Sequence, residues 1–506
     1  MRRETVKLGS FFDGVVRILF VALSVLLVTS EASAVPNIVV IMTDDQDDTS
    51  SMAYMPKAHS LIAAQGITFA NSFVNLPLCA PSRASFLTGQ AAYNHGIRAN
   101  SPLDGGGWEA FKAKEANSLP VWLKAAGYRT ALIGKYLNRY GQQTTLGAWL
   151  AWIGSYLKID FKGTTIGNPR DWVPPGWDLW YAFTGTRVRY YDYSINENGT
   201  ILNFGDGPSD YSTDVLKNRA VGFILAEAKR EDPFFMLIAP KAVHAEGKHA
   251  IPSPKYDQAF RDVSLPMGAA FNEKDVSRKA VKAPRLRKEN MEELELSYRA
   301  ELQSLQSVDD LIEALVDALK STGKLDNTVI IYTSDNGFLF GEHRLVGKSA
   351  AYEESIKVPL IIRGPAIPAN EMRAQLVNNL DVTATILDLA GAAPGVAPDG
   401  RSLAPLLADA DAPWRSALLI EGPVNRFQEK GHRYVGVRTA TRKYVKYDDG
   451  FEELFDLSAD PHEIKNEGRN VSYADDLAAL RDIEATLKGC AGESCWVASS
   501  GRPPGN

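Results

Sequence analysis

The chain has 506 residues, of which 45% are hydrophobic and 23% are charged. This is the composition of a globular protein, and it excludes a disordered chain. The length favours one large domain together with a smaller one. The formal net charge of −6 argues against nucleic acid as a partner.

The first 34 residues predict a cleaved export signal. Scattered basic residues precede an apolar run at 18–28, and the small residues at 32–34 resemble a cleavage site. A membrane anchor is the alternative, but the run is shorter than the roughly 20 residues that span a bilayer. We expect cleavage after Ala34 and no stable membrane span. The mature protein would be periplasmic, extracellular or lysosomal, depending on the organism.

Two expected strands lead directly into clusters of oxygen-bearing side chains. The apolar run 36–42 precedes Asp44 and Asp45, and the run 327–333 precedes Asp335 and Asn336. Each cluster alone fits a turn or a helix cap equally well. Two such clusters favour a metal site, because sites in α/β folds lie beyond the carboxyl ends of strands. Hard oxygen donors suit Ca²⁺ or Mg²⁺ rather than zinc.

Cys79 is the candidate reactive group. Of the three cysteines, Cys490 and Cys495 lie near enough in sequence to pair, which would leave Cys79 alone in an oxidising compartment. The sequence predicts a helix over 82–88 that ends at Gly89. Cys79 would then lie at a helix N-terminus, where the N–H groups and the dipole favour negative charge. The alternative is a buried, inert cysteine.

The later apolar runs predict an α/β fold. Strand-like segments at 234–238 and 358–362 alternate with helical stretches, and apolar residues recur at helical spacing from Tyr298 to Leu319. We therefore expect a large mixed, mostly parallel central sheet sandwiched by helices. The Trp-rich segment 146–157 is expected to be a packed helix or a lid.

The pattern changes towards the C-terminus. Beyond the Pro/Gly/Ala-rich stretch 392–398, short alternating segments such as 434–438 and 443–447 are typical of antiparallel strands. We expect a catalytic domain at 35–405 and a small antiparallel-sheet subdomain at 406–506.

The segment that starts at Cys79 resembles a known signature. Residues 79–89, Cys-Ala-Pro-Ser-Arg-Ala-Ser-Phe-Leu-Thr-Gly, match the sulfatase pattern C-x-P-S-R-x-x-x-L-T-G. Other landmarks similar to those of sulfatases occur in the family's order, namely Asp44, Asp45, 134–135, His244, 334–337, 341–343, Lys348 and 381–391. The resemblance implies the fold of the alkaline-phosphatase and sulfatase superfamily.

The same resemblance implies a sulfuric ester hydrolase with a modified Cys79. In sulfatases a formylglycine-generating enzyme oxidises this cysteine to Cα-formylglycine (3-oxoalanine), and the hydrated aldehyde attacks sulfur to give a covalent sulfo-enzyme intermediate. The implied ligands of Ca²⁺, or of Mg²⁺, are Asp44, Asp45, Cys79, Asp335 and Asn336. The residues implied to bind sulfate or to stabilise the diol are Arg83, Lys135, His244 and Lys348.

One departure from the family pattern concerns the segment 134–138. Many sulfatases read Gly-Lys-Trp-His where this chain reads Gly-Lys-Tyr-Leu-Asn, so the histidine that assists the diol is missing. Asn138 is no base at neutral pH, whereas His343 can act as one, and our hypothesis places the role on His343. Together with 174–180 and 190–193, the segment resembles N-acetylglucosamine-6-sulfatases and heparan 6-O-endosulfatases.

The substrate expected from this resemblance is a sulfated sugar, such as N-acetylglucosamine 6-sulfate, or an aryl sulfate. Trp177, Trp180 and Tyr190 either stack on the sugar or belong to the core. Phosphonate monoester or phosphodiester hydrolases of the superfamily are the enzymatic alternative, because both anions need similar cations. The non-enzymatic alternative is a glycan-binding protein in which Cys79 is unmodified.

Overall fold

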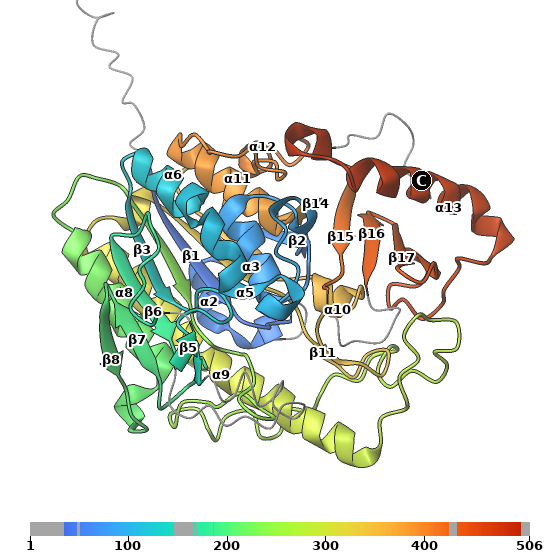
Figure 1. The fold of residues 1–506 in the computed structure, drawn as a ribbon, viewed down its shortest axis with the longest axis horizontal. Helices are drawn as coiled ribbons and strands as arrows, with labels where there is room; N and C mark the ends of the chain where they lie inside the picture. Colours follow the sequence, from blue (N-terminus) through green and yellow to red (C-terminus); the bar gives the residue numbers. More distant parts are fainter. Residues whose placement is uncertain are drawn as a thin grey trace, which may run out of the picture. The chain divides into compact units, whose positions relative to one another are not determined.

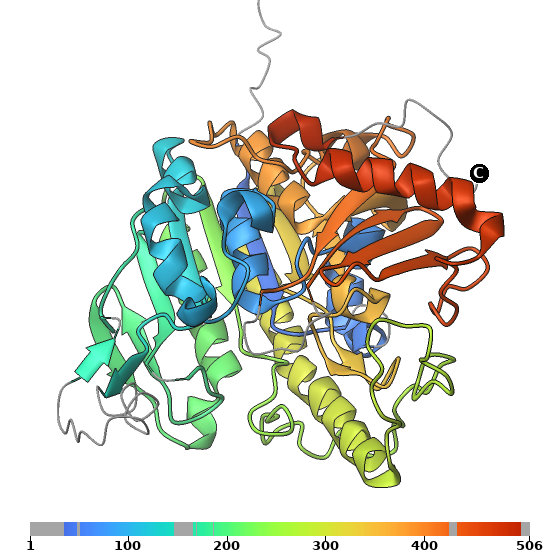
Figure 2. The same ribbon diagram turned by 45° about the vertical axis from the view of Figure 1, so that its right-hand side comes forward.

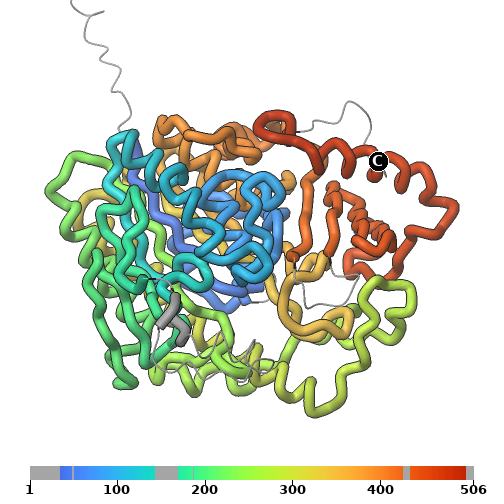
Figure 3. The backbone as a smooth tube through the Cα atoms, in the orientation of Figure 1, coloured from blue at the N-terminus to red at the C-terminus, as the bar shows by residue number. Residues whose placement is uncertain are grey.

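The centre of the fold is a ten-stranded mixed sheet (Figure 1). Its neighbouring strands follow the order β14-β2-β13-β10-β1-β9-β3-β6-β7-β8. Its four central strands are parallel neighbours: β10 (Thr328–Ser334), β1 (Asn37–Thr43), β9 (Phe234–Ala239) and β3 (Arg129–Gly134). The first strand, β1, thus pairs with β10 from the second half of the sequence, within the backbone path traced in Figure 3. Three of these strands were expected from their apolar runs, and those predictions are confirmed.

The outer strands make the sheet mixed. They are β13 (Leu360–Arg363), β2 (Ile67–Phe73) and β14 (Glu371–Asn378) on one side, and β6 (Leu179–Thr184), β7 (Ser194–Glu197) and β8 (Thr200–Asn203) on the other. β13 is antiparallel to both its neighbours, and so is β7. The predicted large, mixed sheet is confirmed.

Helices cover both faces of this sheet. Ile38, Val40 and Met42 of β1 face one buried core, and Val39 and Ile41 face a second one. Successive side chains of a strand point to opposite faces, so a strand that is covered on both sides is apolar throughout. The helices of the first core are α3 (Cys79–Thr88), α5 (Gly107–Phe111), α6 (Leu119–Ala125), α11 (Asn379–Ala390) and α12 (Ala404–Ala408). Those of the second core are α2 (Pro56–Leu61), α8 (Ser212–Glu227) and α9 (Lys288–Ser321), which contains the predicted helical repeat.

A separate antiparallel sheet lies near the C-terminus. Its strands are β15 (Ala417–Glu421), β16 (Tyr434–Thr439), β17 (Arg442–Tyr447) and β18 (Glu452–Asp456). Helix α13 (Ala474–Leu487) packs on this sheet (Figure 2). The expected small antiparallel sheet is confirmed. The domain boundary at 405 stays a prediction, and α12 runs across it.

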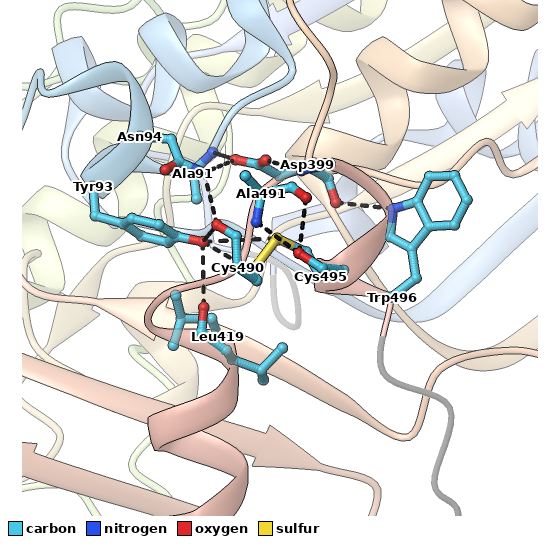
Figure 4. The surroundings of a disulfide bond; sticks show 12 residues. Ala91, Tyr93, Asn94, Asp399, Leu419, Cys490, Ala491, Cys495 and Trp496 are labelled. Carbon is cyan, nitrogen blue, oxygen red and sulfur yellow. Dashed lines mark hydrogen bonds between the residues drawn. A yellow bond between two sulfur atoms is a disulfide. The ribbon is translucent and has the colours of Figure 1, made fainter.

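Cys490 and Cys495 form a disulfide bond beyond α13, as the cysteine count suggested (Figure 4). The hydroxyl of Tyr93 donates a hydrogen bond to the carbonyl of Cys490 at 2.5 Å and so ties this end of the chain to α4 (Ala92–His95). Cys79 is left free and buried.

The computed structural model describes residues 35–47, 51–145, 165–167, 169–185, 187–424 and 433–496. The predicted export signal at 1–34 and the predicted helix or lid at 146–157 lie outside these residues. In the described part of the chain, no helix combines the length and the apolar character that crossing a membrane requires. Further short elements are β4 (Gln143–Thr145), β5 (Thr165–Gly167), β11 (Leu339–Phe340), β12 (Val346–Gly347) and α10 (Glu353–Ile356).

Candidate active site

The carboxyl ends of the four central strands bring the site together. Polar residues follow each strand: Asp44 and Asp45 follow β1, Lys135 follows β3, and Asp335 and Asn336 follow β10, while the turn after β9 carries His244. Because neighbouring parallel strands end at the same edge, these residues meet although they are far apart in sequence. The N–H of Asp45 donates to the Asp335 carboxylate at 3.1 Å, and the amide of Asn336 donates to Asp45 at 2.8 Å. The two predicted clusters therefore form one site.

Helix α3 presents Cys79 to this site. The helix begins at Cys79 and is followed by Gly89 with a φ of 69°, a left-handed conformation that glycine adopts readily. Cys79 thus lies at a helix N-terminus, as predicted. The N–H of Ala80, which a helix start leaves without an intrahelical partner, donates to the side chain of Asn100 at 2.9 Å. No pattern in the sequence linked Asn100 to this helix.

The Cys79 thiol is buried between carboxylates and a cation. Its Sγ lies 3.6 Å from Asp44 Oδ1 and 3.8 Å from Asp45 Oδ1, and Lys348 Nζ donates to it at 2.9 Å. Burial raises the pKa of the thiol to about 11, although Lys135 and Lys348 oppose this shift. An unmodified Cys79 is therefore protonated near neutral pH, and the thiol form is a weak nucleophile.

Each buried carboxylate of the site is paired with a cation. The pairs are Arg83 with Asp335 at 2.8 Å, Lys135 with Asp44 at 2.5 Å, and Lys348 with Asp45. Burial raises the pKa of Asp44 and Asp45, but the neighbouring cations outweigh it and both pKa values lie below the usual range. At Asp335 burial prevails over Arg83, and the pKa is raised. Arg83, Lys135 and Lys348 thus lie together at this site.

The oxygen donors of the site fit a divalent cation. Asn336 Oδ1 is buried and has no hydrogen-bond partner within the described part of the chain. A buried polar atom without a partner is costly, and a bound cation would satisfy it. Asp44, Asp45, Cys79 and His244 also offer ligand atoms within 4.8 Å of one another. Oxygen donors of this kind suit Ca²⁺ or Mg²⁺.

His244 faces the carboxylates through one ring nitrogen. Its Nδ1 lies 2.8 Å from the carbonyl of Ala245, which can only accept a hydrogen bond, so Nδ1 carries a proton. The other nitrogen, Nε2, lies 3.6 Å from Asp45 Oδ2. Burial lowers the pKa of His244 against the opposing effect of Asp45. In the neutral ring, Nε2 therefore holds the lone pair and faces the site.

His343 lies in a different cluster. Its Nδ1 is 3.0 Å from the Glu273 carboxylate and 2.6 Å from Lys279 Nζ, and its ring stacks on Tyr352 with a centroid distance of 3.8 Å. These partners are not residues of the site, and His343 is not among the ligand atoms grouped around Cys79. Burial lowers its pKa to about 4. The geometry gives the role hypothesised for His343 no support, and we do not retain it.

A pocket of about 500 Å³ opens onto the site. Asp44, Lys135 and His244 line it on the side of the site. The other polar groups that line it include Asn100, Asn138, Arg187, Arg189, Lys241 and Glu246. A pocket of this size accommodates a small ligand such as a sugar.

Trp177, Trp180 and Tyr190 do not line this pocket. All three are buried, and their rings pack in the two cores that flank the sheet. Of the two interpretations of these aromatic residues, the core is confirmed.

Fold and site together define a class of protein. A parallel sheet edge with hard oxygen donors, three cations paired with buried carboxylates and a buried cysteine at a helix N-terminus is an arrangement suited to the hydrolysis of anionic esters. The sulfatase family model matches residues 36–392, and a second model, the C-terminal region of N-sulphoglucosamine sulphohydrolase, matches residues 341–488. The chain belongs to the sulfatase family and is a sulfatase, an enzyme that hydrolyses sulfate esters.

Individual proteins resemble this chain over most of its length. Human N-acetylglucosamine-6-sulfatase is 34% identical over 504 residues, which cover 91% of this chain and 86% of the relative. A solved structure in complex with its substrate D-glucosamine-2-N,6-O-disulfate is 26% identical, with a TM-score of 0.69 over 90% of this chain and 97% of the other. Phosphonate monoester hydrolase of Agrobacterium radiobacter shares the fold, with a TM-score of 0.63 at 20% identity, over 90% of this chain and 95% of the other.

Proposed function

We propose that this sulfatase removes the 6-O-sulfate from glucosamine residues of sulfated glycans. The observation that carries the proposal is the 34% identity with human N-acetylglucosamine-6-sulfatase over 91% of this chain. The relative solved with a 6-O-sulfated glucosamine supports the same class of substrate. The polar pocket beside Lys135 and His244 has room for a sugar ring.

The working group at position 79 is proposed to be formylglycine rather than cysteine. The buried thiol is a weak nucleophile, whereas a hydrated aldehyde supplies a hydroxyl for attack on sulfur and later releases sulfate by C–O cleavage. Pro81 and Arg83 match the residues that a formylglycine-generating enzyme reads, and this enzyme is the proposed maturation partner. The cations Arg83, Lys135 and Lys348 of the site would stabilise the negative charge that develops in such an attack.

The proposed roles of the other residues follow from their positions. A Ca²⁺ or Mg²⁺ ion held by Asp44, Asp45, Asp335 and Asn336 would polarise the ester sulfate and lower the pKa of the attacking hydroxyl. Arg83, Lys135 and Lys348 bind the sulfate oxygens, because cations act strongly on charge in a site with a low dielectric constant. His244 acts as a general acid or base through Nε2, while the carbonyl of Ala245 accepts the hydrogen bond of Nδ1 and so orients the ring.

A mass spectrum and a substrate panel test this proposal. Conversion of the thiol to an aldehyde lowers the mass of the Cys79 peptide by about 18 Da. N-acetylglucosamine 6-sulfate, an aryl sulfate and a phosphonate monoester are then assayed in parallel, with Cys79→Ala as the inactive control. We expect the 6-sulfated sugar to be the preferred substrate. Turnover of the phosphonate alone, or an unshifted peptide from the native source, would overturn the proposal.

We also propose that the protein is exported. The Cys490–Cys495 disulfide supports an oxidising compartment. A Caenorhabditis elegans relative described as a putative extracellular sulfatase is 34% identical over 79% of this chain and 54% of its own length. N-terminal sequencing of the mature protein should begin at Val35, and a chain that retains residues 1–34 would contradict export by cleavage.

A further inference from the structure

Lys241 is a buried cation beside the site, and none of the roles proposed above involves it. It follows β9, the strand between β1 and β3, and its side chain is 4% exposed. The loop around it is attached to the site, because the N–H of Asp44 donates to the carbonyl of Ala242 at 3.0 Å. The N–H of His244 in turn donates to the carbonyl of Lys241 at 2.9 Å. Lys241 is therefore held beside Asp44 and His244 and lines the same pocket.

The ammonium of Lys241 forms no ion pair with a carboxylate of the described residues. No carboxylate oxygen of the described residues lies within 4.0 Å of its Nζ. Within the described parts of the chain, its ammonium donates one long hydrogen bond, at 3.4 Å, to the carbonyl of Ala245, and the Tyr190 ring centroid lies 5.2 Å away. Burial is the largest effect on the pKa of Lys241 and lowers it. A charge buried in this way is costly unless an anion pairs with it.

The carboxylates nearest to Lys241 are engaged elsewhere. Glu246 pairs with Arg189 at 3.2 Å and also accepts the N–H of Tyr190 at 3.0 Å. Asp44 accepts the ammonium of Lys135 at 2.5 Å. Among the described residues, these carboxylates are therefore not available to Lys241, and an anion of the substrate could pair with it.

A count of charges leads to the same conclusion. Within the described residues, the three carboxylates of the site are matched by three cations that pair with them one to one. Lys241 is a further cation in the same pocket, and Arg187 lines that pocket as well. Asn138 also lines it, and its buried Oδ1 lacks a hydrogen-bond partner among the described residues. The pocket thus offers more positive charge and more hydrogen-bonding groups than a single ester sulfate uses.

We propose that the substrate carries a second anionic group besides the sulfate that is cleaved, and that Lys241 binds this second group. The inference rests on the proposed function and narrows it to doubly charged sugars. The second group is a sulfate or a carboxylate, either on the same ring or on the neighbouring sugar. A charge-assisted hydrogen bond in a buried site increases kcat/KM for such a substrate by about 10- to 100-fold.

Three substrates and two variants test the inference. The substrates are N-acetylglucosamine 6-sulfate, glucosamine 2-N,6-O-disulfate, and a 6-sulfated glucosamine linked to a hexuronate. The second substrate carries its additional anion as a sulfate on the same ring, and the third carries it as a carboxylate on the neighbouring sugar. The wild type should prefer one of the two doubly charged sugars by about 10- to 100-fold in kcat/KM. Lys241→Met should abolish this preference and leave turnover of the monosulfate within about threefold, whereas Lys241→Arg should keep part of it.

The controls separate this inference from its alternatives. Lys248→Met removes an exposed lysine that pairs with Glu293 and does not line the pocket, so it should change nothing. If Lys241→Met lowers kcat/KM equally for all three substrates, Lys241 binds the cleaved sulfate and the inference is overturned. A wild type that does not prefer a doubly charged sugar would overturn it too. If no substrate is turned over, the proposed function fails. Titration calorimetry of Cys79→Ala and Cys79→Ala/Lys241→Met with the same sugars then still decides whether Lys241 selects the doubly charged ones.

Discussion

The replacement Arg83→Met tests the charge balance of the site. Arg83 is 3% exposed, its Nε lies 2.8 Å from Asp335 Oδ2, and its guanidinium donates to the carbonyl of Lys135 at 3.0 Å. Without it, the cation left beside the Asp335 carboxylate among the described residues is Lys135, at 4.0 Å. Breaking a buried ion pair by removing one partner costs about 3–5 kcal/mol, because the remaining charge stays buried and unpaired.

This cost can be read as a shift in melting temperature. For the compact unit Pro36–Asn506, about 2.1 cal/mol/K per residue gives an unfolding entropy of about 1 kcal/mol/K. We therefore expect Arg83→Met to lower the Tm of the metal-free protein by about 3–5 °C, measured by calorimetry in EDTA. The double variant Arg83→Met/Asp335→Asn removes both charges and should recover at least half of the loss. If the single and the double variant have the same Tm, the unpaired charge of Asp335 does not cause the loss of stability and the reasoning is wrong.

Three further predictions concern the metal, the pH dependence and the disulfide. Asn336→Ala should weaken Ca²⁺ binding to the metal-free protein about 10- to 100-fold in titration calorimetry, because Oδ1 is free to bind the cation; an unchanged affinity would remove Asn336 from the ligands. Burial lowers the pKa of His95 to about 3, against about 6.5 in the unfolded chain, so only the unfolded state gains this proton as the pH falls from about 6.5 to 3. The free energy of unfolding therefore falls over this window by up to about 1.4 kcal/mol per pH unit, which corresponds to one proton. His95→Gln should reduce the measured slope of the unfolding free energy against pH by about this amount, whereas an unchanged slope would contradict the burial argument. Cys490→Ala/Cys495→Ala opens a short loop and should cost about 2 kcal/mol in chemical unfolding without loss of turnover, and a loss of turnover would show that the disulfide supports the site.

Local patterns predicted the elements well wherever the structure depends on neighbours in sequence. The apolar runs that became β1, β9 and β10 are strands, and the helix after Cys79 ends at Gly89 as expected. The acidic clusters behind two of these strands meet at one site, because the order of parallel strands places their ends together.

Other features of the site could not be read from local patterns. His343 belongs to the landmark segment 341–343, yet its ring packs against Tyr352 and Glu273 instead of facing Cys79. Asn100 and Lys241 belong to the site or its pocket although nothing beside them in sequence distinguishes them. Which way a side chain points depends on packing between distant segments, and sequence spacing does not encode this direction.

The sequence by itself determined the family chemistry of this protein: a motif cysteine at a helix start, oxygen donors behind buried strands, and cations in a fixed order. These depend on residue type and on short-range spacing. Only the tertiary structure decided which charges are paired and which are not. Arg83, Lys135 and Lys348 each pair with a carboxylate, whereas Lys241 pairs with none of those in the described residues. Pairing depends on distances of a few ångströms between strand ends, and those distances exist only once the sheet has formed.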